Sequence, residues 1–182
     1  LALFLINIYN SLIKLRVKTN EAWSDVDTQL IRRYDLIPNL VETVKGYAKQ
    51  EEQVFTQVSK LRSGMMNTED PKELGVMEGE LRSTLKSLFA VAEAYPELKS
   101  DQNFRELQQT LEDIETEIEG ARRYYNGVVR DLNTQLVVFP NNIIAGFFPQ
   151  FKQREFFEVA DAAQRENVNV DFSTDSKASD AK

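Results

Sequence analysis

One apolar stripe, repeated every three or four residues, runs through residues 101–139 and constrains the fold more than any other feature. Its steps alternate between three and four from Phe104 to Phe139, and only Gln135 is polar. No proline interrupts the stretch, and its two glycines lie off the stripe. Because this spacing puts the apolar side chains on one helical face, it predicts a long amphipathic helix with a coiled-coil-like seam.

A helix with one apolar face needs partner helices to cover that face. The rest of the sequence predicts three of them: a first helix that ends at Tyr34, a second at about 36–62, and a third at 71–95. Each carries an apolar stripe with helical spacing, and glycine and proline are scarce. We therefore expect an all-α protein, an antiparallel up-and-down four-helix bundle with long helices.

Acidic residues and prolines mark the predicted helix ends. Pro38 is disfavoured inside a helix but tolerated in a first turn that Asp35 can cap, so we expect the chain to reverse there. Asp70 and Pro71 predict the start of the third helix in the same way. Ser100 or Asp101 is expected to cap the long helix.

The composition excludes several classes of function. A net charge of −7, with no basic face, argues against a general nucleic-acid binder. The chain has no cysteine and no histidine, which removes thiol chemistry, disulfides and the commonest acid–base group and transition-metal ligand. Phosphate-binding and dinucleotide-binding motifs are also absent from the sequence. We expect a protein that is not an enzyme and that holds no cofactor or metal.

The first thirteen residues are mostly apolar, and Lys14, Arg16 and Lys18 follow without an acidic residue before Glu21. An apolar stretch that ends in basic residues is typical of a membrane span where it meets an anionic surface. We interpret residues 1–13 as the distal part of a truncated transmembrane anchor that runs into the first helix. The alternative is an ordinary helix start packed on the bundle. We expect residues 14–160 to form the bundle with a Phe-rich C-terminal cap, and residues 161–182 to form a polar, disordered tail.

Six phenylalanines lie within residues 139–157, where two prolines enclose a short helical turn. This much apolar surface must be covered or must serve as a contact surface. Two interpretations stay open: the segment folds back and plugs one end of the bundle, or it contacts a partner or the membrane. The candidate contact residues are Phe147, Phe148, Phe151, Phe156 and Phe157.

Two groups of charged residues are candidate sites. Glu112, Glu115 and Glu119 share one face of the long helix, so they form either a solvated face or a weak cation site. Arg33 borders the apolar stripe of the first helix, and we expect it to form an ion pair with an acid such as Asp35. Ligand binding by Arg33 is the alternative.

Several blocks of sequence together resemble the LemA family over roughly residues 5–160. The most specific are RRYDLIPNLV at 32–41 and EAYPELK at 93–99. NEAWS at 20–24, RRYYN at 122–126 and the pair Phe156 and Phe157 add to the similarity.

The resemblance implies a bacterial or archaeal protein with one N-terminal transmembrane helix and an antiparallel four-helix bundle on the cytoplasmic side. It also implies an uncharacterised molecular function without established catalytic residues. We therefore expect a single-pass protein of the cell membrane that acts as an interaction or scaffold module. Its partners would be the membrane, through the N-terminal helix, and another protein. The alternative function is a cation-binding or carboxylate-dependent bundle that uses the acidic face of the predicted fourth helix.

Overall fold

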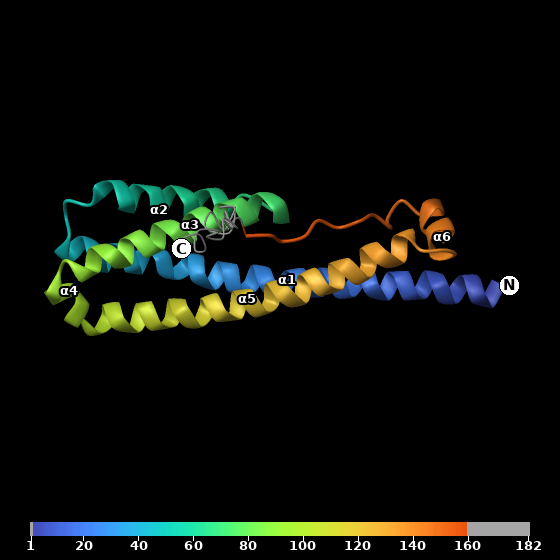
Figure 1. Cartoon of the computed structure of the whole chain (residues 1–182), viewed down its shortest axis with the longest axis horizontal. Coiled ribbons are helices and arrows are strands. Elements are labelled where there is room, and N and C mark those ends of the chain that lie inside the picture. Colours follow the sequence, from blue (N-terminus) through green and yellow to red (C-terminus); the bar gives the residue numbers. More distant parts are fainter. Residues whose placement is uncertain (1, 160–182) are drawn as a thin grey trace, which may run out of the picture.

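The computed structural model describes residues 2–159, and within them the regular structure is all helical, as predicted. The tail predicted at 161–182 lies outside the described residues. The molecule is elongated, with the start of α1 and α6 at one end and α4 at the other (Figure 1). The helices are α1 (Ala2–Tyr47), α2 (Glu52–Met65), α3 (Pro71–Glu93), α4 (Pro96–Ser100), α5 (Gln102–Val137) and α6 (Asn141–Phe147).

Two long helices, α1 with 46 residues and α5 with 36, pack side by side and extend along the molecule (Figure 1). The predicted stripe of α5 is buried against α1, and Leu136 takes the place of Gln135 on the buried face. Asp101 caps α5, because its carboxylate accepts a hydrogen bond of 2.9 Å from the Phe104 amide. The prediction of this helix is confirmed to within two residues at each end.

The shorter helices α2 and α3 pack against each other and cover α1 and α5 over only part of their length (Figure 1). The predicted start of α3 is confirmed: Pro71 is its first residue, and Asp70 accepts a hydrogen bond of 2.9 Å from the Lys72 amide. The described residues form six helices rather than four long ones of similar length, so the finer prediction of an up-and-down four-helix bundle is not confirmed.

The predicted chain reversal at Asp35 and Pro38 is wrong, because α1 continues through Pro38 and ends at Tyr47. Proline has no amide hydrogen, so the carbonyl of Tyr34, four residues earlier, lacks its usual helical donor. Nε of Arg62 in α2 donates a hydrogen bond of 2.7 Å to that carbonyl. The chain reverses instead at residues 48–51, just before α2 begins at Glu52.

Buried apolar side chains form two clusters. The larger one lies where α2 and α3 pack on the two long helices. The smaller one lies near the other end and contains Leu12, Leu132, Leu136, Ala145 and Phe151. After α6, residues 148–159 return along the molecule towards α2 and α3 without regular structure (Figure 1). We call this segment the strap.

Within residues 2–159, no helix contains an apolar stretch long enough to cross a membrane. At the start of α1, the side chains of Leu3, Phe4, Leu5 and Ile6 are between 83% and 44% exposed. The predicted anchor at residues 1–13 therefore stays a prediction.

Candidate functional site

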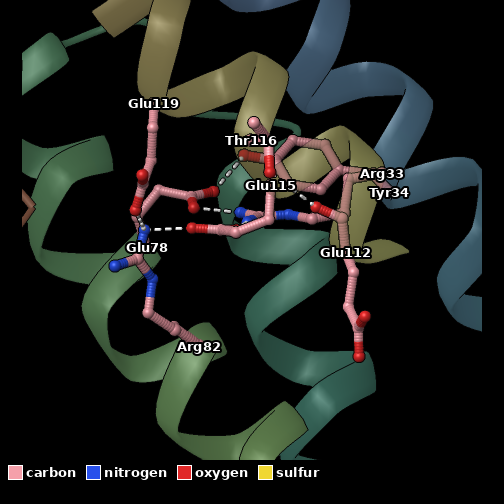
Figure 2. Close-up of polar contacts among 8 residues, drawn as sticks. All are labelled: Arg33, Tyr34, Glu78, Arg82, Glu112, Glu115, Thr116 and Glu119. Carbon is pink, nitrogen blue, oxygen red and sulfur yellow. Dashed lines mark hydrogen bonds and ion pairs between the residues drawn. The ribbon is translucent and has the colours of Figure 1, made fainter. Parts of the chain in front are cut away.

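A buried ion-pair network joins α1, α3 and α5 (Figure 2). Arg33 of α1 is 1% exposed and contacts two carboxylates. Its Nη2 donates to Glu78 of α3, which is also 1% exposed, and its Nη1 donates to Glu115 of α5 at 2.7 Å. The hydroxyl of Tyr34 donates to the other oxygen of Glu78 at 3.0 Å. A single guanidinium thus holds three helices together.

The network continues to the surface through Arg82 of α3. Arg82 pairs with the second oxygen of Glu115 and lies 3.7 Å from an oxygen of Glu119. Glu115 is therefore held between Arg33 and Arg82, as Figure 2 shows. From the core outward, positive and negative groups alternate, which offsets the cost of burying each charge.

Burial and charge pairing set the ionisation of the buried members. Burial by itself would lower the pKa of Arg33, but the adjacent charges of Glu78 and Glu115 outweigh it, so the pKa of Arg33 is raised. Burial, followed by the negative charge of Glu78, raises the pKa of Tyr34. At neutral pH Arg33 is charged and Tyr34 is neutral, and both serve as donors.

Chemically, this network suits structural pairing better than catalysis. The oxygens of Glu78 and Glu115 already accept hydrogen bonds from guanidinium or hydroxyl groups. A metal ion or a substrate group could bind these carboxylates only by displacing a donor that they already hold, and for the guanidinium groups that donor is charged. The network instead fixes the positions of α1, α3 and α5 relative to one another.

The predicted partner of Arg33 was wrong, because Arg33 pairs with Glu78 and Glu115 rather than with Asp35. Two residues along a helix correspond to about 200° of rotation, so Asp35 lies on the exposed side. Sequence reasoning missed Glu78, although a signal was present. Glu78 lies between Leu74 and Leu81 on the apolar stripe of α3, where a charged residue calls for a partner.

The predicted cation face is divided in the structure. Glu115 and Glu119 contact Arg82, whereas Glu112 is exposed and points away from the network in Figure 2. Among residues 2–159 there is no group of three or more acidic side chains placed to hold a metal ion. Cation binding at this face stays a prediction.

The structure divides the Phe-rich segment between the core and the surface. Phe151 and Phe157 are buried, at 8% and 0% exposure, and Phe157 packs edge-on against Trp23 with ring centroids 5.7 Å apart. Phe147 is 78% exposed, while Phe148 and Phe156 are 38% exposed. Both predicted roles thus remain open, because Phe151 and Phe157 fill the core whereas Phe147 faces outward.

An apolar groove lies between the start of α1 and α6, with a volume of about 540 Å³. Its lining residues are Leu5, Ile6, Tyr9, Ile143, Ile144, Phe147 and Phe148. Phe139, which the predicted stripe places on the buried face of the long helix, is instead 79% exposed, beyond the end of α5. We call residues 3–9 and 137–148 together the apolar end of the molecule.

The chain segments next to the apolar end carry basic residues and no acidic ones. Residues 1–20 and 132–154 contain no aspartate or glutamate, although the whole chain carries a net charge of −7. They do contain five basic residues, of which Lys14, Arg16, Lys18 and Lys152 form the border, whereas the side chain of Arg154 lies further along the molecule, beside Asn20. An apolar surface with a basic border thus occupies one end of an otherwise acidic molecule.

A model of the LemA family matches residues 22–172, which is most of the chain. The chain belongs to the LemA family. The match includes the blocks at 32–41 and 93–99 on which the resemblance rested, and that prediction is confirmed.

Individual relatives are distant. Magnetosome protein MamQ 2 of Paramagnetospirillum magneticum is 24% identical over 176 residues, covering 82% of this chain and 64% of the relative. Protein LemA of Metamycoplasma hominis is 24% identical over 170 residues, covering 90% of this chain and 74% of the relative. The MamQ of Magnetospirillum gryphiswaldense is 22% identical over 175 residues. This LemA-family chain therefore spans slightly less than two thirds of the length of the MamQ proteins that it matches.

Proposed function

We propose that this LemA-family chain is a non-catalytic interaction module of the cell membrane, whose apolar end contacts the lipid bilayer. The observation that carries the proposal is the apolar end itself, with its groove of about 540 Å³ and its basic border. The rest of the molecule then extends away from the membrane as an elongated helical body (Figure 1). In a single-pass arrangement that body lies on the cytoplasmic side, where anionic lipid favours the basic border.

The exposed side chains are suited to lipid rather than to water. Leu3, Phe4 and Phe147 are each more than half exposed, and soluble proteins rarely gather such residues into one patch. Each Leu, Ile or Phe that enters the apolar part of a bilayer contributes roughly 1.5–3 kcal/mol. Lys14 and Lys18 follow about three and about four turns further along α1. Each basic residue near an anionic surface adds about 1 kcal/mol.

The alternative function, a cation-binding or carboxylate-dependent bundle, has less support. Glu115 and Glu119 are paired with Arg82, and only Glu112 of the three has an exposed carboxylate without that partner. The absence of cysteine and histidine from the sequence leaves acid–base catalysis to carboxylates, lysine and tyrosine. We therefore propose a role in binding rather than in catalysis.

The test is co-flotation of the full chain with vesicles of zwitterionic lipid, with and without anionic lipid. In the test variant, Ile143→Ser and Phe147→Ser remove two exposed apolar side chains from the apolar end. The matched control, Ile31→Ser with Val76→Ser, removes two side chains of which each is 49% exposed elsewhere. We expect the test variant to lose vesicle binding and the control to keep it. Equal binding by both variants would refute membrane contact through α6.

A further inference from the structure

Two asparagines of α5 hold the backbone of the strap. The amide group of Asn126 accepts from the Phe157 N–H at 2.9 Å and donates to the Phe157 carbonyl at 3.0 Å. The amide group of Asn133 binds Arg154 in the same two-sided way, at 2.9 Å for both bonds. Each asparagine thus satisfies both main-chain groups of one strap residue, as a neighbouring β-strand would.

The spacing of these asparagines matches that of an extended chain. Asn126 and Asn133 are seven residues apart, which places them on one face of α5 at a separation of about 10 Å. Arg154 and Phe157 are three residues apart, which is also about 10 Å in an extended backbone. The strap runs antiparallel to α5. The side-chain amides of Asn126 and Asn133 therefore lie opposite two residues of the extended segment that are three positions apart.

Only a few strap side chains take part in this recognition. Phe157 is completely buried against Trp23 and acts as an anchor. The hydroxyl of Tyr125 donates to the Glu155 main-chain carbonyl at 2.9 Å, so this contact too is with the backbone and not with a side chain. The side chains of Glu155 and Phe156 are exposed. The contacts therefore favour any segment that has an extended backbone and an aromatic side chain at the position of Phe157. They require no particular side chains at the exposed positions before it.

On α3, the surface at Gly75 lies in close contact with the main chain of the strap. A Cβ atom at Gly75 of α3 would overlap the carbonyl group of Glu158, so only glycine lets the strap backbone lie there. Side chains of α5 hold the main chain at Arg154, Glu155 and Phe157, and residues 151–158 form no helix. The segment can therefore leave without the loss of any helical hydrogen bond.

We propose that the groove bounded by α1, α5 and Gly75 is a peptide-binding site, which the strap occupies in cis. Its partner in trans is a protein that presents an extended segment with an aromatic residue at the position of Phe157. This inference rests on the proposed interaction role and names the class of partner. A partner segment binds by replacing the strap between Asn126 and Asn133 and by inserting its aromatic side chain beside Trp23.

The experiment measures binding of a fluorescently labelled peptide that copies residues 149–157 and ends in an amide. The full chain is compared with Gly75→Ala, which displaces the strap at Glu158 and leaves the groove for this shorter peptide intact. We expect Gly75→Ala to bind the peptide at least about tenfold more tightly than the unchanged chain, whose own strap competes. Phe157→Ala, which weakens the strap from the other side, provides a second variant with the same expected gain.

Two further changes test how the peptide is recognised. Adding Asn126→Ala to Gly75→Ala removes two hydrogen bonds to the peptide and is expected to weaken binding by about tenfold or more. Adding Thr134→Ala, an exposed position of α5, is the matched control and leaves the affinity unchanged. A peptide with alanine in place of its last phenylalanine is expected not to bind, whereas one with serine at the positions of residues 152–155, whose side chains are exposed, is expected to bind.

The proposal is overturned if neither loosened variant binds the peptide while circular dichroism shows native helix content, or if Asn126→Ala leaves the affinity unchanged. Vesicle flotation of the same variants separates this result from the proposed function. Loss of peptide binding with intact flotation overturns the groove alone. Peptide binding without flotation supports the groove and overturns membrane contact.

Discussion

Replacing Arg33 by methionine removes the centre of the ion-pair network while keeping much of the side-chain volume. The carboxylate of Glu78, which is 1% exposed, then retains only the hydroxyl of Tyr34 as a partner. An unpaired charge at such depth costs about 3–5 kcal/mol. For a chain of this length, that corresponds to a fall in Tm of roughly 6–20 °C.

Replacing Glu78 by methionine costs less, because Arg33 keeps Glu115, whose side chain is 29% exposed. We expect a loss of about 2–4 kcal/mol from this single substitution. The double variant leaves neither charge buried without a partner, so its free energy of unfolding stays within about 2 kcal/mol of the unchanged chain. The two substitutions are therefore expected to be strongly non-additive.

The assay is guanidinium chloride unfolding of the full chain and the three variants, followed by far-ultraviolet circular dichroism. It yields a double-mutant cycle, and we expect a coupling energy of at least about 2 kcal/mol. Additive losses, with a coupling below about 0.5 kcal/mol, would refute the account of a mutually dependent buried pair.

Three further predictions test other contacts. Arg62→Ala removes the donor to the Tyr34 carbonyl, which Pro38 leaves without its helical partner, and we expect it to lower the free energy of unfolding by about 1–2 kcal/mol. In a Pro38→Ala background the loss should be smaller, as measured by chemical unfolding. An equal loss in both backgrounds would contradict this compensation. Asn126→Ala is expected to accelerate hydrogen exchange of the Phe157 amide but not of the Arg154 amide, as measured by NMR. Acceleration of both amides, or of neither, would contradict the view that Asn126 and Asn133 hold the strap independently. Hydrogen bonds from the Phe104 amide and then from Tyr47 lower the pKa of Asp101 in the folded chain. Its carboxylate therefore stabilises the fold above its unfolded pKa of about 4, and this effect is lost as the pH falls. The unfolding midpoint of Asp101→Asn should decline less between neutral and acidic pH than that of the unchanged chain, and an equal decline would contradict this.

The features that could be predicted from sequence were local ones. The stripe of α5 repeats over ten steps, and the caps Asp70 and Asp101 act on amides two or three residues away. Periodicity and capping depend on near neighbours in the chain, so the sequence contains all the information that they need.

The errors and omissions came from contacts between distant segments. Pro38 indicates a helix break when only its neighbours are considered, but Arg62, 28 residues beyond Tyr34, supplies the missing donor. Arg33 pairs with acids 45 and 82 residues away. The pairing of Asn126 with the strap depends on a chain reversal that periodicity does not reveal.

The sequence leaves the role of the Phe-rich segment open, because burial of each phenylalanine depends on the path of the chain after α6. Phe151 and Phe157 reach the core only because the strap returns along α5. Phe147 stays exposed at the end of α6. Composition could indicate the apolar surface but could not divide it between core and contact.

The most direct test of the central claim places a fluorescent probe at the apolar end. The chain contains no cysteine, so Phe147→Cys and, at an exposed position of α2, Gln57→Cys can each carry one environment-sensitive label. With vesicles that contain anionic lipid, we predict a blue shift and quenching by brominated acyl chains for the label at 147, and no change at 57. Spectra at 147 that stay the same with and without vesicles would contradict contact between the apolar end and the membrane.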